Sequence, residues 1–208
     1  MIKFFSKLIL VVIITSIVSV SQANENEKKL MIFGDSLTAG YGLRQEDAFS
    51  AKLERSLKLM GKSVKIISSS VSGDTSSGGN NRILWALSDK PDAVILELGA
   101  NDGLRGIDPK VTYHNLYSIM EKLKNNNIKV LIAGMLAPPN LGKEYGEEFN
   151  QIYTRLAYEF NSQLYPFFLK GVVNKPHLNQ PDGIHPNEAG IDDIIKRILP
   201  MVINFIKS

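Results

Sequence analysis

Cysteine is absent from this 208-residue chain, and histidine occurs only three times. The missing cysteine excludes disulfide bonds, thiolate metal sites and a cysteine nucleophile. The histidines show no paired metal-ligand spacing, so we expect no metal site. Positive charge is barely in excess, with 24 lysines and arginines against 21 acidic residues. A nucleic-acid groove needs a basic stripe, so we expect no nucleic-acid partner.

A hydrophobic run long enough to cross a membrane is also missing. The apolar run from Leu8 to Val20 is shorter than the about 20 residues that a spanning helix needs. Lysines precede this run and Ser21-Gln22-Ala23 follows it, an order typical of a secretory signal peptide. We expect cleavage after Ala23, which removes residues 1–23 and leaves residues 24–208 as one exported domain, periplasmic or secreted. We expect this mature chain to be monomeric and without a membrane span; an uncleaved, membrane-tethering N-terminus is the alternative.

Short apolar runs alternate with segments of helical period along the rest of the chain, a pattern typical of βαβ units. Several runs are continuous, as in strands that are buried on both faces of a parallel sheet. They predict strands over residues 29–33, 64–68, 93–98, 129–134 and 164–168. The intervening segments predict helices over about residues 49–60, 80–87, 109–123, 147–160 and from 186 onward. The expected fold is a three-layer α/β/α sandwich around a five-stranded parallel sheet, with its ligand at the carboxyl ends of the strands.

In three of the predicted helices, the sequence indicates which side chains are buried in the core. The first helix has an apolar face that we expect to pack on the sheet, formed by Phe49, Leu53, Leu57 and Met60. The apolar stripe of the last helix is interpreted as a core face rather than a membrane-binding face. Trp85, the only tryptophan, lies in the predicted helix over residues 80–87 and is expected in the core.

Small and polar residues follow three of the predicted strands where each strand ends. Ser36 comes directly after the first strand, where its hydroxyl is a candidate nucleophile. Gly73 follows the second strand and Asn101 the third, and a backbone N–H and a side-chain amide are neutral donors that can stabilise an oxyanion. Simpler interpretations stay open: Asp35 or Ser36 as a helix cap, Gly73 as a turn glycine, and Asn101 as a loop asparagine.

Asp182 and His185 stand three residues apart, just before the last predicted helix. One rigid turn can present both side chains, with Asp182 holding the imidazole tautomer and His185 facing the nucleophile. A capping aspartate beside a surface histidine is the alternative. His114 lies within a predicted amphipathic helix, and His177 lies in a loop without a matching acidic partner. His185 is therefore the best candidate for a general base.

Four sequence blocks occur in order and are spread over nearly the whole mature chain: residues 34–43, which begin Gly34-Asp35-Ser36-Leu37; Ser72-Gly73-Asp74-Thr75; residues 97–106, which include Gly99-Ala100-Asn101-Asp102; and Asp182-Gly183-Ile184-His185-Pro186. In these blocks the chain resembles the SGNH hydrolases of the GDSL family, and within it the secreted thioesterase, lysophospholipase and arylesterase group. The resemblance implies a flavodoxin-like SGNH hydrolase fold and a catalytic triad of Ser36, Asp182 and His185. It also implies an oxyanion hole formed by Ser36, Gly73 and Asn101. Ala100 stands where many members have a second glycine, which adds one methyl group beside that site.

The combined pattern predicts an exported serine acyl hydrolase that cleaves carboxylic esters and thioesters through an acyl-serine intermediate, without a cofactor. Apolar residues near the strand-end loops indicate a groove for an acyl chain: Leu104, Ile107, Leu136, Pro138, Pro139 and Leu141. Expected substrates are small-molecule esters with medium to long acyl chains, which include arylesters, acyl-CoA-type thioesters and lysophospholipids. An O-deacetylase for carbohydrate or cell-wall acetyl esters and a non-catalytic lipid- or glycan-binding module are the alternatives.

Overall fold

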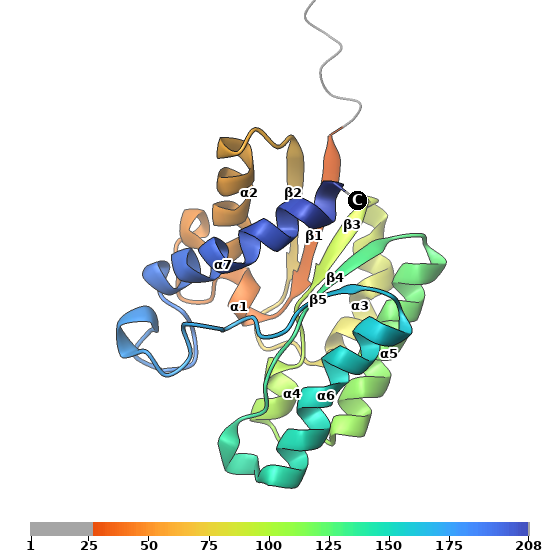
Figure 1. Ribbon diagram of the computed structural model, residues 1–208, viewed down its shortest axis with the longest axis vertical. Helices are drawn as coiled ribbons and strands as arrows, with labels where there is room; N and C mark the ends of the chain where they lie inside the picture. Colours follow the sequence, from red (N-terminus) through yellow and green to blue (C-terminus); the bar gives the residue numbers. More distant parts are fainter. Residues whose placement is uncertain (1–26, 208) are drawn as a thin grey trace, which may run out of the picture.

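The computed structural model describes residues 27–207, which form a parallel β-sheet with helices on both faces (Figure 1). The sheet has five strands in the order β2-β1-β3-β4-β5, and every neighbouring pair is parallel. The strands are β1 (Lys28–Gly34), β2 (Val64–Ser70), β3 (Ala93–Leu96), β4 (Lys129–Ala133) and β5 (Gln163–Tyr165). This is the order of a flavodoxin-like doubly wound sheet, and the expected three-layer α/β/α sandwich is confirmed.

The helices form one layer on each face of the sheet (Figure 1). Helices α2 (Phe49–Leu59) and α7 (Glu188–Lys207) contact each other on one face, and α3 (Ser76–Ala86), α5 (Pro109–Asn125) and α6 (Lys143–Glu159) cover the other. Short 3-10 helices span Gln45–Asp47, Leu87–Asp89, Pro139–Leu141 and Pro176–Leu178. Two short α-helices, α1 (Ser36–Ala39) and α4 (Ala100–Leu104), follow β1 and β3 and therefore start at the carboxyl edge of the sheet.

Burial on both faces of the sheet explains why the apolar runs are continuous. In β1 the five residues from Leu30 to Gly34 are all buried. This strand has a partner on each side and a helix layer on each face, so none of these positions points toward solvent. The largest fully buried side chains include four phenylalanines, Phe33, Phe49, Phe149 and Phe168.

Three strands end earlier than their apolar runs predict. β4 stops at Ala133, one residue before the predicted end. β3 stops at Leu96 instead of Leu98, and Gly99, with a φ of +112°, then turns the chain into α4. β5 spans Gln163–Tyr165 instead of residues 164–168, because Pro166 has no N–H to continue the ladder.

Two helices begin earlier than apolar periodicity predicts. α3 starts at Ser76 instead of residue 80, and the Thr75 hydroxyl caps it by accepting the N–H of Gly78. α6 starts at Lys143 instead of residue 147. The first turn of α3 contains only serines and glycines, and that of α6 contains one aromatic residue, Tyr145, among polar residues and a glycine, so neither turn shows an apolar periodicity.

The expected position of Trp85 is wrong, because 77% of this residue is exposed. α3 buries Ser76, Gly79, Ile83 and Ala86. Trp85 is two residues after Ile83, which rotates it by about 200° around the helix and away from the buried face. Met60 is also exposed, since it lies just beyond the end of α2, whereas the other three members of its predicted apolar face are buried.

The predicted signal peptide, residues 1–23, lies outside the described residues. Between residues 27 and 207, no helix combines the length and the apolar character that a membrane crossing requires. The apolar stripe of α7 is buried through Ile191, Ile194, Ile198 and Val202, so its interpretation as a core face is confirmed.

Phe168 connects the segment after β5 to α2, because its fully buried ring packs edge-to-face on Phe49 with ring centroids 5.2 Å apart. We expect Phe168→Ala to lower the free energy of unfolding by about 3–5 kcal/mol, since it leaves a cavity in the core. Urea unfolding followed by circular dichroism measures the loss. The exposed Leu59→Ala serves as control and should change stability by less than about 0.5 kcal/mol. Equal losses in the two variants would contradict the packing described here.

Candidate active site

A serine, a histidine and an aspartate form a hydrogen-bonded chain at the carboxyl edge of the sheet. His185 Nε2 lies 2.9 Å from Ser36 Oγ, and His185 Nδ1 lies 2.7 Å from Asp182 Oδ2. An ionised carboxylate can only accept, so the network assigns the ring hydrogen to Nδ1 and leaves Nε2 to accept the Ser36 hydroxyl. A serine nucleophile that is activated by a general base requires this geometry.

The turn that carries Asp182 and His185 is held by its own backbone. Asp182 Oδ1 accepts the N–H groups of Ile184 and His185 at 2.9 and 3.0 Å. The backbone N–H of His185, together with its ring, lowers the pKa of Asp182 to about 2. The carboxylate is therefore ionised at neutral pH and available to the imidazole. Asn187, whose Oδ1 accepts the N–H of Gly190, lies at the start of α7, so Asp182 is not a cap of that helix.

Asn101 connects the segments that contain Ser36 and Gly73. Its Nδ2 donates to the carbonyl oxygen of Asp74 at 2.9 Å and to Asp35 Oδ2 at 3.2 Å. These acceptors are the immediate neighbours of Gly73 and Ser36 in the chain. The three predicted oxyanion residues thus lie at one place, where the adjacent strands β2, β1 and β3 end. Both N–H bonds of the Asn101 amide are engaged in this structure.

Gly73 is a turn glycine, as its simpler interpretation states. Its φ of +81° lies in the left-handed region, which glycine adopts without strain. Its carbonyl accepts a hydrogen bond from Arg105 Nη2 at 2.9 Å. The turn role does not conflict with an oxyanion role, since the latter uses the backbone N–H.

Asp35 caps α1, which is one of the simpler interpretations of the Ser36 segment. Its Oδ1 accepts the N–H of Leu37 at 3.0 Å, and its side chain is fully buried. Ser36 nevertheless faces His185, so the cap and the candidate nucleophile occupy the same turn. Burial is the main cause that raises the pKa of Asp35 to about 6.

A second carboxyl group, Glu97, is buried beneath the same turn. Its Oε2 accepts the backbone N–H of Asp35 at 3.3 Å and the hydroxyl of Thr38 at 3.1 Å. Thr38 also bonds Ser70 at the end of β2, at 2.8 Å. Burial raises the pKa of Glu97 well above its ordinary value, and the nearby charge of Asp35 adds to this rise. Glu97 therefore connects the ends of three strands, and its raised pKa favours the protonated form.

Arg82 of α3 is a further polar anchor that no sequence motif indicates. Its Nε lies 2.6 Å from Asp74 Oδ2, while its Nη1 and Nη2 donate to the carbonyls of Ser69 and Gly34 at 2.8 and 3.0 Å. The guanidinium also lies 3.9 Å from the centroid of the Phe33 ring. Arg82 thus ties the ends of β1 and β2 to the turn that contains Gly73.

The residues expected to line an acyl groove lie in two neighbouring segments, one around the end of α4 and one after β4. Pro138 packs against α4, because a Cβ added at Gly103 would lie 3.1 Å from its Cδ. The carbonyl of Ile107 accepts the Tyr145 hydroxyl at 2.8 Å. Pro139 starts the 3-10 helix Pro139–Leu141. Leu104 and Leu136 are about half exposed, so both segments offer apolar surface.

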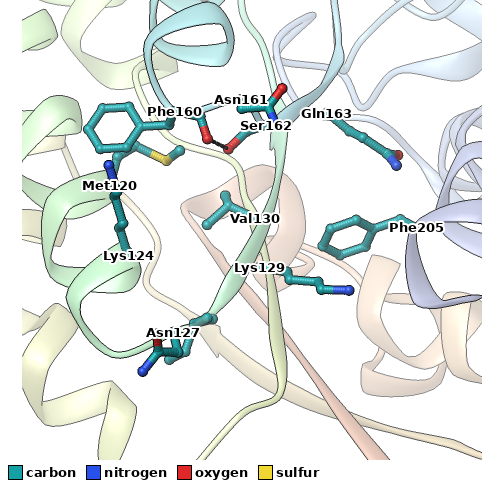
Figure 2. Close-up of a pocket in the computed structure, with 11 residues that line it drawn as sticks. Met120, Lys124, Asn127, Lys129, Val130, Phe160, Asn161, Ser162, Gln163 and Phe205 are labelled. Atoms are coloured by element: carbon teal, nitrogen blue, oxygen red, sulfur yellow. Dashed lines mark hydrogen bonds between the residues drawn. The ribbon is translucent and has the colours of Figure 1, made fainter. Parts of the chain in front are cut away.

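A separate surface pocket of about 420 Å³ lies at the opposite edge of the sheet (Figure 2). Its lining includes Lys129 and Gln163, which begin β4 and β5, and the aromatic rings of Phe160 and Phe205. It contains none of the predicted site residues. Across residues 27–207, no three histidine, aspartate or glutamate side chains gather into a cluster that could hold a metal ion.

A serine that is hydrogen-bonded to a histidine at the carboxyl edge of a doubly wound sheet is an arrangement suited to hydrolytic chemistry. The chain matches the model of the GDSL-like Lipase/Acylhydrolase family over residues 32–192, and it belongs to that family. The predicted enzyme class, a hydrolase of carboxylic esters and thioesters, is confirmed.

Characterised relatives share most of the chain. An arylesterase of Vibrio mimicus is 41% identical over 167 residues, which cover 80% of this chain and 84% of the relative. The thioesterase 1/protease 1/lysophospholipase L1 of Escherichia coli is 39% identical over 178 residues, which cover 83% and 84%. The psychrotrophic esterase EstA from Pseudoalteromonas sp., in a crystal structure inhibited by monoethylphosphonate, matches with a TM-score of 0.83 and 31% identity, and covers 87% of this chain and 100% of that chain.

Glu97→Gln tests whether the pKa of the buried Glu97 carboxyl group is raised in the folded protein. The folded protein retains a proton on Glu97 that the unfolded chain releases above its ordinary pKa of 4.5, so this residue makes stability fall as pH rises toward its raised pKa. Asp35 also makes stability fall as pH rises, but only up to about pH 6, where its own pKa lies. Above about pH 6 we therefore expect the variant to gain stability relative to the wild type as pH rises toward the raised pKa of Glu97.

Urea unfolding at several pH values measures this difference. Glu148→Gln removes an exposed carboxyl group and is the matched control. Parallel stability curves for the wild type and Glu97→Gln would show that Glu97 is ionised in the folded protein.

Proposed function

We propose that the chain is a serine acyl hydrolase in which Ser36 attacks the substrate carbonyl and His185 removes the serine proton. Asp182 orients the imidazole and stabilises its charge after proton transfer. The observation that supports this assignment is the continuous pair of hydrogen bonds, 2.9 Å from Ser36 to His185 and 2.7 Å from His185 to Asp182.

The reaction proceeds in two steps. Attack by Ser36 Oγ forms a tetrahedral intermediate, and its collapse breaks the bond to the alcohol or thiol, which takes the proton from His185. Water, which His185 deprotonates, then attacks the acyl-serine and releases the carboxylic acid, while Ser36 regains its hydrogen. No cofactor takes part in either step.

The oxyanion of each tetrahedral intermediate would be held by the backbone N–H groups of Ser36 and Gly73 and by the Asn101 amide. Both N–H bonds of that amide already have partners, so the oxyanion must replace one of them. The bond to Asp35 is the longer, at 3.2 Å against 2.9 Å for Asp74. We infer that it is the bond exchanged.

Preferred substrates are esters and thioesters with medium to long acyl chains, which include arylesters and lysophospholipids. Two observations support this. Leu104, three residues after Asn101, and Leu136 are both about half exposed on segments that meet where Pro138 packs near Gly103. The relatives include one named arylesterase and one named thioesterase 1/protease 1/lysophospholipase L1. Burying each additional methylene contributes about 0.8 kcal/mol, so an apolar groove favours longer acyl chains.

We also propose that residues 1–23 form a cleaved signal peptide and that residues 24–208 act as one exported, monomeric domain. The lysines, the apolar run and Ser21-Gln22-Ala23 support export. The first strand begins at Lys28, a few residues beyond the proposed cleavage site.

Ser36→Ala is the test of the proposed nucleophile. With p-nitrophenyl esters from acetyl upward, we expect the activity of the chain from Asn24 to rise with acyl length and to be lost in the variant, because no other group can form the acyl-enzyme. A fluorophosphonate should label the wild type at Ser36 only. Ser88→Ala, which changes an exposed serine in the 3-10 helix Leu87–Asp89, is the control.

Two results would contradict this proposal. Absence of labelling in folded protein would favour a non-catalytic binding module. Activity confined to the acetyl ester would favour the deacetylase and exclude the apolar groove as the specificity element.

Asn101→Ala tests the oxyanion role. Because the backbone N–H groups remain, we expect a partial loss of about 10²- to 10³-fold in kcat with little change in KM. Steady-state kinetics on one aryl ester measures both values. If KM rose by about 10²- to 10³-fold while kcat stayed constant, Asn101 would instead be assigned to ground-state binding of the substrate.

A further inference from the structure

The ring of Tyr41 packs on the imidazole of His185. The two ring centroids lie 4.6 Å apart, and the ring planes are tilted by 36°. Just over half of Tyr41 is exposed, so this residue lies between His185 and solvent. Neither the hydrogen-bonded chain nor the oxyanion donors require an aromatic residue here.

The backbone of Tyr41 is fixed on both sides, so the stacking does not depend on a freely moving loop. Its N–H donates to the carbonyl of Ser36 at 3.2 Å, and its own carbonyl accepts Gln180 Nε2 at 2.7 Å. Gly40 and Gly42, with φ of +80° and +72°, form the turn on either side. Gln180 also precedes the Asp182–His185 turn, so one side chain joins the segments of the two stacked rings.

The charge of His185 changes during the proposed reaction, and this change gives the stacking a chemical consequence. The imidazole is neutral before attack and becomes an imidazolium when it takes the Ser36 proton. A cation within about 6 Å of an aromatic centroid is attracted by the negative ring face, whereas a neutral imidazole gains much less. An interaction that is stronger in the transition state than in the ground state raises kcat.

Carboxylates act on the same imidazole from other sides. Asp182 bonds Nδ1, and Asp35, beneath the Ser36 turn, interacts with His185 through its charge. Nε2 faces Ser36. Tyr41 differs from these groups because it adds no charge of its own and covers a side of the ring that would otherwise face water.

We propose that Tyr41 is a positioning residue whose aromatic ring stabilises the imidazolium of His185 during acylation and deacylation. The proposal rests on the proposed function, in which His185 is the general base. It assigns the effect to the ring and not to the hydroxyl group.

The test compares Tyr41→Phe, Tyr41→Trp and Tyr41→Leu. Phe and Trp keep an aromatic face, whereas Leu keeps apolar bulk without one. An exposed cation–π contact predicts a kcat/KM that is about two- to fivefold lower in Tyr41→Leu. The acidic limb of the plot of kcat/KM against pH should move by roughly 0.4 to 0.7 pH units toward lower pH. Phe and Trp should retain both values.

Tyr158→Leu is the matched control, because this tyrosine of α6 is 88% exposed and lies outside the site. Thermal unfolding of each variant checks that the fold is intact. A Tyr41→Leu profile that coincides with the wild type would overturn the proposal. So would an equal loss in Tyr41→Phe, since the effect would then belong to the hydroxyl.

A second readout separates this proposal from the proposed function. Proton NMR titration of the His185 ring, assigned with His185→Gln and measured in Ser36→Ala protein, needs no turnover. A titration midpoint that moves to lower pH in Tyr41→Leu but stays in place in Tyr41→Phe supports the stacking effect even if no ester is hydrolysed. Loss of hydrolysis only in Ser36→Ala supports the proposed function independently of Tyr41.

Discussion

Parallel pairing of β1 with β2 and β3 fixes where the site residues lie. Phe33 is in register with Ser69 on one side and with Leu96 on the other. All three strands therefore end at nearly the same height, and the segments that follow them meet above the sheet edge. A slip of one register step would reverse which side chains face each layer, and the buried apolar residues of β1 make such a slip costly.

Buried polar side chains connect the ends of these strands through hydrogen bonds. Arg82 satisfies the terminal carbonyls of β1 and β2, and Glu97 accepts from the Asp35 backbone and from Thr38. Burying a lone charge is costly, and the structure limits that cost in two ways. Arg82 is paired with Asp74, while burial raises the pKa of Glu97 and so favours its uncharged form. The Ser36 turn therefore rests on hydrogen bonds to two buried carboxyl groups, Asp35 and Glu97, although Oε1 of Glu97 has no hydrogen-bond partner among the described residues.

Several features of the site could be predicted from the sequence because they depend on neighbouring residues. The Asp182–His185 turn is local, and its spacing alone permits the contact observed between the two side chains. Ser36 directly follows a strand that its apolar run makes recognisable. By contrast, Glu97, Arg82 and Tyr41 act through partners far away in the chain, so no periodicity or spacing indicates them. The predicted core position of Trp85 is wrong because the face that α3 buries depends on how this helix packs on the rest of the fold.

The class of fold, the order of the motifs and the residue types able to perform acyl transfer can be predicted from the amino-acid sequence, because they follow from local periodicity and from the family resemblance of the four blocks. The contacts among these residues come from the tertiary structure. It stacked Tyr41 on His185, buried Asp35 and Glu97 together, and connected Asn101 to the neighbours of Ser36 and Gly73. Such contacts depend on strand register and helix packing, which arise from the whole core and not from any one segment.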